Sequence, residues 1–350
     1  MRIAQISPLY ESVPPQEYGG TERVVSFLTE ELVRQGHDVT LFASADSTTS
    51  ARLVPMVPRS LRLDQKSVDA LAHHVLMLEH VSRVADRFDV LHYHIDYLHF
   101  PYSRMLGVPH VTTLHGRLDI ADLQPLYDEF QDMPVISISD AQREPLPQAN
   151  WQGTVYHGLP PDLFAPSVAG GEYLVFLGRI SPEKRVDRAI EIARRAGMPL
   201  KVAAKVDTAD AEYFKTEIAH LLELPFVEYL GEVGEHDKQP LLAGARAMLF
   251  PIDWREPFGL VMIEAMACGT PTIAWREGSV PEVLEDGVSG FIVDEIDDAV
   301  EAVRRCASLD RRVVRGAFEG RFTADRMARD YVAIYERLAG ATGRAAELHA

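Results

Sequence analysis

Short apolar runs alternate with helical patterns along this 350-residue chain, and this alternation limits the possible folds more than any other feature. In the first half we predict helices over residues 21–35 and 68–86. The predicted strands of that half are 2–7, 38–43, 90–93, 110–114, 134–138 and 153–156. Strands that alternate with helices in this way favour a parallel sheet with both faces covered.

The same alternation begins again after residues 159–171, a stretch rich in Pro, Gly and Ala that we interpret as a linker. It predicts helices over 186–196 and 210–222. The second set of predicted strands is 173–177, 200–204, 227–230, 247–251, 271–274 and 291–293. We therefore expect two Rossmann-like, doubly wound α/β domains, 1–160 and 172–323, that face a deep cleft with the carboxyl ends of their strands.

Charge and composition exclude several classes of protein. The net charge of −17 disfavours broad binding to nucleic acid or to anionic lipid. No run approaches the roughly 18 apolar residues of a membrane span, and the start of the chain has no signal-peptide pattern. Cys268 and Cys306 stand in apolar helical contexts that suit buried thiols in a reducing compartment. We expect a cytoplasmic protein without stable membrane insertion.

The strongest chemical signal is a pair of carboxylates, Glu256 and Glu264, which flank seven residues between a predicted strand and a helix. Residues 258–260 lie between them, and their N–H groups at the positive end of the helix suit a diphosphate. Each carboxylate can accept hydrogen bonds from the hydroxyls of a sugar or a ribose. The spacing fits equally well two acidic residues that merely stabilise a helix N-terminus.

A second signal follows the strand predicted at 173–177, where Arg179 and Lys184 flank a turn. A planar guanidinium and a compact ammonium can clamp a diphosphate and stabilise its charge as it departs. Taken alone, the segment also fits a surface loop in which Glu183 and Lys184 pair in solvent.

Gly19 and Gly20 follow Tyr18 between the first predicted strand and the first helix. Two glycines before a helix N-terminus allow the backbone to approach a phosphate or a sugar closely. The segment is not G-x-G-x-x-G, and no acidic residue follows at the dinucleotide distance, which argues against a nicotinamide enzyme. A plain helix-entry turn capped by Thr21 is the alternative.

His115 follows the strand predicted at 110–114, at an end expected to face the cleft. An imidazole there can bind hydroxyls or move a proton, although a structural role is the more common one for a single histidine. The histidine-rich run from His92 to His99 matches no standard zinc spacing. The chain also has no Asp-x-Asp to hold a divalent ion on a diphosphate. We expect neither a metal nor another cofactor.

Together these motifs resemble the retaining glycosyltransferases of family 4, which have the GT-B fold. The resemblance covers nearly the whole chain. It includes the Gly-Gly loop, Thr113-Leu-His-Gly116, the Gly-Arg…Glu-Lys segment, Glu-x7-Glu, and Glu277-Gly-Ser-Val-Pro-Glu282 with Asp286-Gly-Val-Ser-Gly290. The order of the motifs and their positions at strand ends make the combination specific. The family also implies a last helix, 324–342, that crosses back to the first domain.

The resemblance implies a role for each candidate residue. Arg179 and Lys184 bind the diphosphate of a nucleotide-sugar donor. Glu256 holds hydroxyls of the transferred sugar, Glu264 holds the ribose, and His115 lies beside the sugar. The other implied substrate-binding residues are Gly19 and Gly20 near the phosphate and acceptor, Phe258, Gly259 and Leu260 near the sugar, and Lys205, Val206 and Val233 near the base.

The implied activity is metal-independent transfer of a hexose, with retention, from a UDP-sugar to a hydroxyl acceptor, and UDP-glucose is the first donor to consider. Loops 46–66 and 119–132 are expected to bind the acceptor. Alternatives are a nucleotide-sugar epimerase, a sugar phosphorylase, or a non-catalytic nucleotide-sugar-binding protein. A phosphorylase needs a second cationic site that the sequence does not offer, and a non-catalytic relative would be expected to have lost Arg179, Lys184 or Glu256.

Two positions depart from the family pattern. His157-Gly158 stands at the hinge, where Asn-Gly is frequent, and Arg185 stands after Lys184, where Gly is usual. The first leaves the hinge contacts open and the second leaves the geometry of the cations open.

Overall fold

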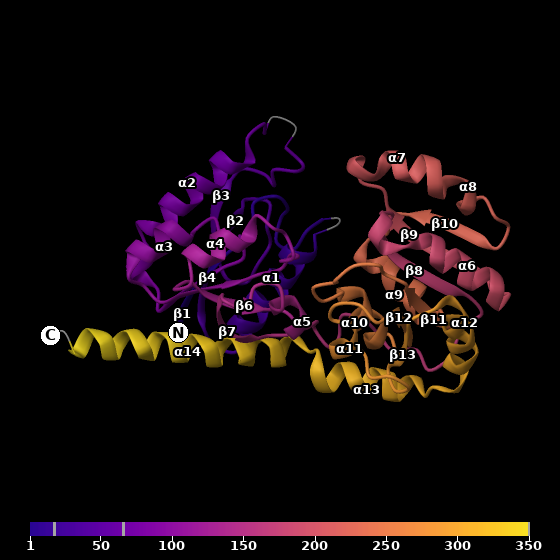
Figure 1. The fold of residues 1–350 in the computed structure, drawn as a ribbon. Coiled ribbons are helices and arrows are strands. Elements are labelled where there is room, and N and C mark those ends of the chain that lie inside the picture. Colours follow the sequence, from indigo (N-terminus) through magenta and orange to yellow (C-terminus); the bar gives the residue numbers. More distant parts are fainter. Residues whose placement is uncertain (17–18, 65–66, 349–350) are drawn as a thin grey trace. The chain divides into compact units, whose positions relative to one another are not determined.

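The computed structural model describes residues 1–16, 19–64 and 67–348, with side chains up to Gly340 apart from that of His236. It contains two compact units (Figure 1). The first unit consists of Met1–Gly158 and Ala324–Ala350, and the second is Leu159–Thr323. The segment 159–171, predicted as a linker, belongs to the second unit. There Leu159 and Phe164 are buried, and the N–H of Ser167 donates to the carbonyl of Cys268 (3.0 Å).

The first unit is built on a seven-stranded parallel sheet of order β3-β2-β1-β4-β5-β6-β7. Its strands are β1 (Arg2–Ile6), β2 (Asp38–Ser44), β3 (Arg52–Val57), β4 (Val90–Tyr93), β5 (His110–Thr113), β6 (Pro134–Ser137) and β7 (Asn150–Thr154). β3 lies inside the predicted acceptor loop 46–66. Its sequence RLVPMV contains a proline and is only partly buried at the sheet edge, so it lacks the signal of a central strand. Gln65 and Lys66 of that loop lie outside the described residues, as does Tyr18.

Helices cover this sheet. They are α1 (Gly20–Arg34), α2 (Ala70–Ser82), α3 (Phe100–Leu106), α4 (Leu123–Glu129), α5 (Asp140–Arg143) and α14 (Ala324–Leu348). α4 lies in the second predicted loop, 119–132. The last helix, α14, belongs to the first unit and lies beside α1, where Arg34 Nη2 contacts Asp325 Oδ1 at 3.0 Å. Tyr331 and Tyr335 of α14 are fully buried in this unit.

The second unit has a six-stranded parallel sheet of order β10-β9-β8-β11-β12-β13. Its strands are β8 (Leu174–Arg179), β9 (Leu200–Lys205), β10 (Val227–Gly231), β11 (Ala247–Phe250), β12 (Thr272–Trp275) and β13 (Gly290–Val293). The first four residues of β8 and all of β11 are buried, as expected for strands covered on both faces. The strand order reverses between β8 and β11, the place where open α/β sheets bind ligands.

The helices of the second unit are α6 (Val186–Ala196), α7 (Ala211–Tyr213), α8 (Ala219–Leu222), α9 (Glu235–Ala243), α10 (Leu260–Ala267), α11 (Val280–Val283), α12 (Ile296–Arg305) and α13 (Arg311–Arg321). α6 has the predicted bounds and buries Val186, Ala189, Ile190 and Ala193 along one face. The single helix predicted over 210–222 is instead divided, because a π-helical segment, Phe214–Ile218, separates α7 from α8.

The two sheets confirm the predicted doubly wound α/β architecture. Cys268 and Cys306 are both buried and free, and burial is the main cause that raises the pKa of each thiol to about 12. Within residues 1–16, 19–64 and 67–348, no helix has both the length and the apolar character needed to cross a bilayer.

Candidate active site

The carboxyl ends of β8 and β11 carry the central part of the site. These strands are neighbours in the sheet although two other strands separate them in the sequence. A 3-10 turn, Pro182–Lys184, follows β8, and the loop 251–259 follows β11. The N–H of Asp253 donates to the carbonyl of Glu183 at 2.8 Å. Because this bond joins the two loops, the predicted cation segment and the predicted carboxylate segment form one structure.

Lys184 and Glu256 form an ion pair between Nζ and Oε2. Trp254 Nε1 donates to the same oxygen at 2.9 Å, and Nζ lies 4.8 Å from the centre of the Trp254 ring system and 5.6 Å from that of Phe250. The two charged side chains are only 14% and 11% exposed. In such a partly desolvated place each charge depends on its partner, because an unpaired ion there would cost several kcal/mol.

A neighbouring glycine shapes the backbone of Glu256. Gly278 has a φ of +54°, and a Cβ on it would lie 2.4 Å from the carbonyl oxygen of Glu256. The next residue, Ser279, donates its N–H to that same oxygen (3.0 Å) and its hydroxyl to the carbonyl of Phe258 (2.9 Å). The motif that begins at Glu277 therefore supports the carboxylate loop through backbone contacts.

Glu264 lies one turn into α10, which begins after Gly259 at a φ of +79°. Its side chain is 2% exposed and accepts from Lys238 Nζ with both oxygens, at 2.9 and 3.2 Å. Lys238 comes from α9 and was not predicted as a site residue. Nothing in its local sequence signals the role, because its partner is 26 residues away.

Arg179, at the end of β8, is surrounded by carboxylates. Its Nη1 contacts Asp207 Oδ2 at 3.2 Å and its Nη2 contacts Glu183 Oε1 at 3.1 Å, while Asp210 lies 4.0 Å away. Lys205 Nζ also lies 3.4 Å from Asp207. Burial raises the pKa of Asp207, but contacts with Arg179 and Lys205 outweigh it and lower that pKa overall. A diphosphate would therefore have to take the place of these carboxylates at Arg179.

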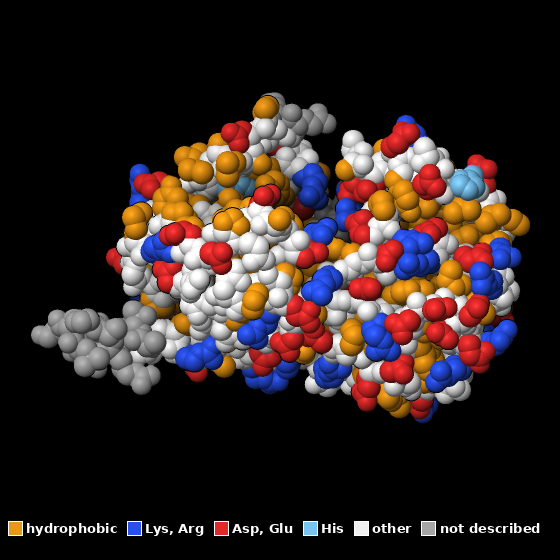
Figure 2. All heavy atoms as spheres, viewed as in Figure 1, with side chains coloured by type: hydrophobic (Ala, Val, Ile, Leu, Met, Phe, Trp, Pro, Cys, Tyr) orange, Lys and Arg blue, Asp and Glu red, His pale blue; other side chains and the backbone are white. Residues whose placement is uncertain are grey.

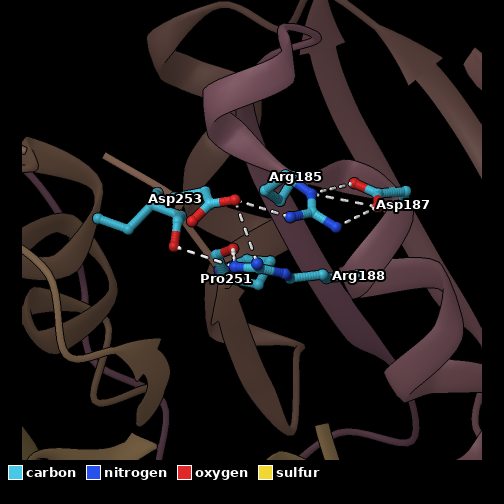
Figure 3. A network of polar contacts seen from close by, with 6 residues as sticks. Arg185, Asp187, Arg188, Pro251 and Asp253 are labelled. Atoms are coloured by element: carbon cyan, nitrogen blue, oxygen red, sulfur yellow. Dashed lines mark hydrogen bonds and ion pairs between the residues drawn. The ribbon is translucent and has the colours of Figure 1, made fainter. Parts of the chain in front are cut away.

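Arg185, the residue that departs from the resembled family pattern after Lys184, adopts the left-handed conformation with a φ of +55°. Figure 3 shows its guanidinium between two carboxylates: Nε donates to Asp187 (2.9 Å) and Nη1 to Asp253 (2.8 Å). Arg188 contacts Asp253 as well (3.2 Å) and donates to the carbonyl of Pro251 (3.3 Å). These contacts hold the backbone turn after Lys184 in its left-handed conformation, although the residue there is an arginine and not a glycine.

The segments predicted to contact the base follow adjacent strands. Lys205 ends β9 and Val206 comes next, and both are half-buried. Val233, also half-buried, lies between β10 and α9. The hydroxyl of Tyr229 on β10 donates to the carbonyl of Ala204 on β9 at 3.0 Å. The two loops are thus held at the same edge of the sheet as Arg179.

In the first unit, Gly19 is the N-cap of α1, and Gly20 is its first residue. Thr21 therefore lies inside the helix and does not cap it, so the alternative of a helix-entry turn capped by Thr21 does not hold. A Cβ on Gly19 would lie 2.8 Å from Pro15 and 3.2 Å from the carboxylate of Glu22. Glu22 is buried, and burial is the main cause that raises its pKa. A carboxyl group beside the glycines suits a hydroxyl better than a phosphate.

His115 follows β5 in the first unit and is half-buried. Its Nε2 lies 2.9 Å from His94 Nδ1, and its ring stacks on that of His157 at 5.4 Å. Its Nδ1 is buried and has no partner within the described part of the chain. Burial lowers the pKa of His115 to about 3, so the ring is neutral. Among the described residues, no three or more His, Cys, Asp or Glu side chains gather as a metal site.

Most of each unit matches the sequence model of a known protein family. Residues 18–151 match "Glycosyltransferase Family 4", and residues 165–312 match "Glycosyl transferases group 1". The chain is a family 4 glycosyltransferase. This membership confirms the predicted enzyme class, and glycosyltransferases of this kind bind a nucleotide-sugar donor and an acceptor.

Relatives of this family 4 glycosyltransferase extend over almost its whole length. It is 27% identical to the phosphatidyl-myo-inositol mannosyltransferase of Mycobacterium leprae, with 97% of each chain covered. A glycosyltransferase involved in avilamycin A biosynthesis has a similar structure, with a TM-score of 0.76 at 26% identity over 97% and 98% of the two chains. An Anabaena protein crystallised with UDP and glucose shares the fold, with a TM-score of 0.73 at 18% identity over 96% and 100%. The predicted GT-B fold is confirmed.

Proposed function

We propose that this glycosyltransferase moves a hexose from a UDP-sugar to an acceptor hydroxyl, with retention of anomeric configuration and without a metal ion. The observation that carries the proposal is the ion pair of Lys184 and Glu256 where β8 and β11 end. A sugar diphosphate contains the two groups that this pair needs, an anion for the ammonium and hydroxyls for the carboxylate.

Binding of the donor would exchange partners and leave neither charged group without a hydrogen-bonding partner. As Lys184 turns to the diphosphate, Glu256 is released, and hydroxyls of the transferred hexose can donate to it. Arg179 can likewise exchange Glu183 or Asp207 for a phosphate oxygen, since its ion pairs with these two carboxylates are partly exposed to solvent. A nucleoside diphosphate without the sugar would satisfy Lys184 and leave Glu256 with Trp254 alone.

The proposed chemistry breaks the bond between C1 of the hexose and the diphosphate oxygen. The acceptor oxygen forms a new bond to C1 on the same face, and the acceptor proton passes to the departing phosphate oxygen. Negative charge grows on the diphosphate during this step, so Lys184 and Arg179 interact more strongly with the transition state than with the ground state. In this proposal the two cations take the place of a divalent ion.

Glu264 and its partner Lys238 are proposed to receive the ribose, and Lys205, Val206 and Val233 to surround the base. Uridine is the first base to test, because the Anabaena protein with the same fold was crystallised with UDP. The two glycines Gly19 and Gly20, beside the carboxyl of Glu22, are proposed to lie near the acceptor hydroxyl.

Calorimetric titration of two variants tests the proposal. Glu256→Ala is expected to bind UDP at least as tightly as wild type does, because no carboxylate is left without its lysine, and UDP-glucose more weakly, because it loses the hexose contacts. Glu264→Ala is expected to bind both ligands more weakly, because it loses the ribose. Glu228→Ala is the matched control, since Glu228 also pairs with a lysine of this sheet, Lys201, at 3.2 Å but is exposed.

All titrations are done with EDTA present, and the anomeric configuration of the product is read by NMR. Equal weakening of UDP and UDP-glucose in Glu256→Ala would show that this carboxylate does not bind the hexose. Binding that needs added Mg²⁺ or Mn²⁺ would overturn the metal-free mechanism, and an inverted product would overturn retention.

A further inference from the structure

A chain of hydrogen bonds joins His115 to the last helix of the protein within the first unit. His115 Nε2 lies 2.9 Å from Nδ1 of His94, whose Nε2 lies 2.7 Å from the side-chain oxygen of Gln5. The amide nitrogen of Gln5 donates to the hydroxyl of Tyr335 on α14 at 3.3 Å. That hydroxyl lies 2.6 Å from Nδ1 of His92. Gln5, Tyr335 and His92 are fully buried and His94 almost so.

The chain continues from His92 to a second tyrosine of α14. His92 Nε2 lies 2.8 Å from the hydroxyl of Thr113, which donates to the hydroxyl of Tyr331 at 2.9 Å. Tyr331 and Tyr335 are one helical turn apart and are both fully buried. They differ in position along the chain of bonds, because only Tyr335 touches Gln5.

The histidines of the chain are neutral. Burial is the main cause that lowers the pKa of His92, His94 and His115, and neighbouring histidines lower the first two further. A neutral imidazole has one N–H and one lone pair. Once the partner of one ring nitrogen is fixed, the state of the other nitrogen is therefore fixed as well.

The direction of the chain follows from Gln5. Its side-chain oxygen can only accept, so His94 carries its proton on Nε2 and presents a lone pair at Nδ1. His115 must then donate from Nε2, which leaves the lone pair on its own Nδ1. This Nδ1 is the buried atom without a partner in the described residues. A buried acceptor without a donor is costly, and a ligand hydroxyl would satisfy it.

We propose that Tyr335, through Gln5 and His94, is a positioning residue that keeps the proton of His115 on Nε2, so that Nδ1 accepts a hydrogen bond from a hydroxyl of the transferred hexose. This inference rests on the proposed transfer reaction and on the position beside the transferred sugar that the family resemblance implies for His115. Tyr335 directs its own proton to His92 and so accepts from Gln5. If the Gln5 amide turned over, its nitrogen would face His94, every donor in the chain would reverse, and His115 would present an N–H instead.

Tyr335→Phe tests the proposal, because it removes one hydroxyl and keeps the buried ring. Tyr331→Phe is the matched control: it makes the same change on the same helix, and Thr113 can still accept from His92. Nitrogen NMR of the full chain with labelled histidine reports which ring nitrogen is protonated, and the His115 signals are assigned by their loss in His115→Ala. We expect wild type and Tyr331→Phe to show a proton on Nε2, and Tyr335→Phe to show partial protonation of Nδ1.

Kinetics supply the second readout. Tyr335→Phe should lower kcat/KM roughly two- to tenfold, the scale of one neutral hydrogen bond. The change should come mainly through the KM for UDP-glucose, because the bond to the sugar is made in both ground and transition state. The affinity for UDP, which has no hexose, should stay as in wild type. If Tyr335→Phe does not fold, Gln5→Met breaks the chain at its centre and should give the same NMR result.

The proposal is overturned if His115 of the wild type carries its proton on Nδ1, or if Tyr335→Phe and Gln5→Met leave its protonation unchanged. It is also overturned if Tyr331→Phe alters His115 as much as Tyr335→Phe does. Failure of the transfer reaction itself would appear differently. UDP-glucose would then not be consumed by the wild type, whereas the NMR experiment on the free protein would still decide whether the chain of bonds orients His115.

Discussion

Both units carry polar groups where central strands end, yet they satisfy them in opposite ways. In the first unit His115 and His94 are neutral and linked through Gln5 to a buried tyrosine. In the second unit Lys184 and Arg179 are charged and held by carboxylates. Among the described residues, every histidine except His220 and His236 belongs to the first unit. On the surface of the second unit Figure 2 shows basic and acidic side chains interleaved.

The difference shows two ways to prepare a site for a ligand. In a chain of neutral hydrogen-bonding groups, each donor determines which atom of the next group donates. The ligand completes the chain when it donates a hydrogen bond to the last free acceptor. In an ion pair each side chain holds the opposite charge of its partner. The ligand must replace one of the two side chains before the other can bind it. The stability of the neutral hydrogen-bonded chain should therefore depend on pH. The ion pair should instead be disturbed when either of its charges is removed.

Acidification should produce the largest difference in stability between the two units. Burial lowers the pKa of five histidine rings of the first unit far below the ordinary value near 6.5: His92, His94, His99, His115 and His157. Below that pH the unfolded chain takes up protons that the folded unit cannot, so stability is complete above about pH 6.5 and falls as the pH drops. The slope is roughly 1.4 kcal/mol per pH unit for each ring that stays neutral.

Urea unfolding of the full chain between pH 7.5 and 5.5, followed by tryptophan fluorescence, measures this difference. Trp151→Phe leaves Trp254 and Trp275, which both report on the second unit, and the Trp254→Phe/Trp275→Phe variant leaves Trp151 in the first. The midpoint reported by Trp151 should fall much further. Equal shifts of the two transitions would mean that the neutral histidines do not set the acid limit of the first unit.

Removal of one charge from the second unit should give the next largest effect. Lys184→Met is expected to lower kcat with UDP-glucose about a hundredfold, on the scale of losing one transition-state donor. Glu256, 11% exposed, also loses its partner, so the unfolding temperature should fall. Lys201→Met is the control, because its pair with the exposed Glu228 is worth little. If the kcat of Lys184→Met stayed within twofold of wild type, Lys184 would have no role in the transfer step.

The glycine that shapes the carboxylate loop allows a smaller and sharper test. Gly278 and Gly287 both have a left-handed φ, +54° and +75°, so alanine costs each about 1–2 kcal/mol of stability. Only at Gly278 does the new Cβ strike the backbone of Glu256; around Gly287 nothing lies within 4 Å. Gly278→Ala should therefore lose about tenfold in kcat/KM and Gly287→Ala almost nothing. Equal activity of the two variants would show that the position of the Glu256 backbone is not critical.

Arg185→Gly should have the smallest effect. Glycine relieves the left-handed conformation, by about 1 kcal/mol, while the variant loses the contacts to Asp187 and Asp253. These opposing changes should leave the unfolding free energy within about 0.5 kcal/mol of wild type and kcat within twofold. Arg188→Ala, which loses a contact to Asp253 without a gain in backbone freedom, is the control. A large loss of turnover in Arg185→Gly alone would give this guanidinium a direct role at the donor.

Much of the candidate site could be predicted because parallel topology brings strand ends together. Arg179, Lys184 and Glu256 follow two strands, and once those strands are adjacent their loops must meet. The alternation of apolar runs located these strands to within a residue or two. The bounds of α6 were predicted fully, because its apolar period and its terminal glycine agree.

The partners of these residues could not be predicted, because they depend on contacts distant in sequence. Lys238 reaches Glu264 from another helix, and Gln5 meets Tyr335 across 330 residues. No local pattern distinguishes these side chains from others of their kind. The edge strand β3 was missed for a different reason, since a half-buried strand with a proline has a weak period.

The return of the chain to its first unit has a consequence for the order in which the protein is completed. The chain leaves that unit after Gly158 and re-enters it at Ala324, so Tyr335 is synthesised only after all of Leu159–Thr323. At 5–20 residues per second, roughly 9 to 35 s pass between the emergence of Gly158 and that of Tyr335. During this time the newly made first sheet has no tyrosine to hold Gln5. By this reasoning the nascent enzyme acquires an oriented His115 only after the whole second unit has been translated.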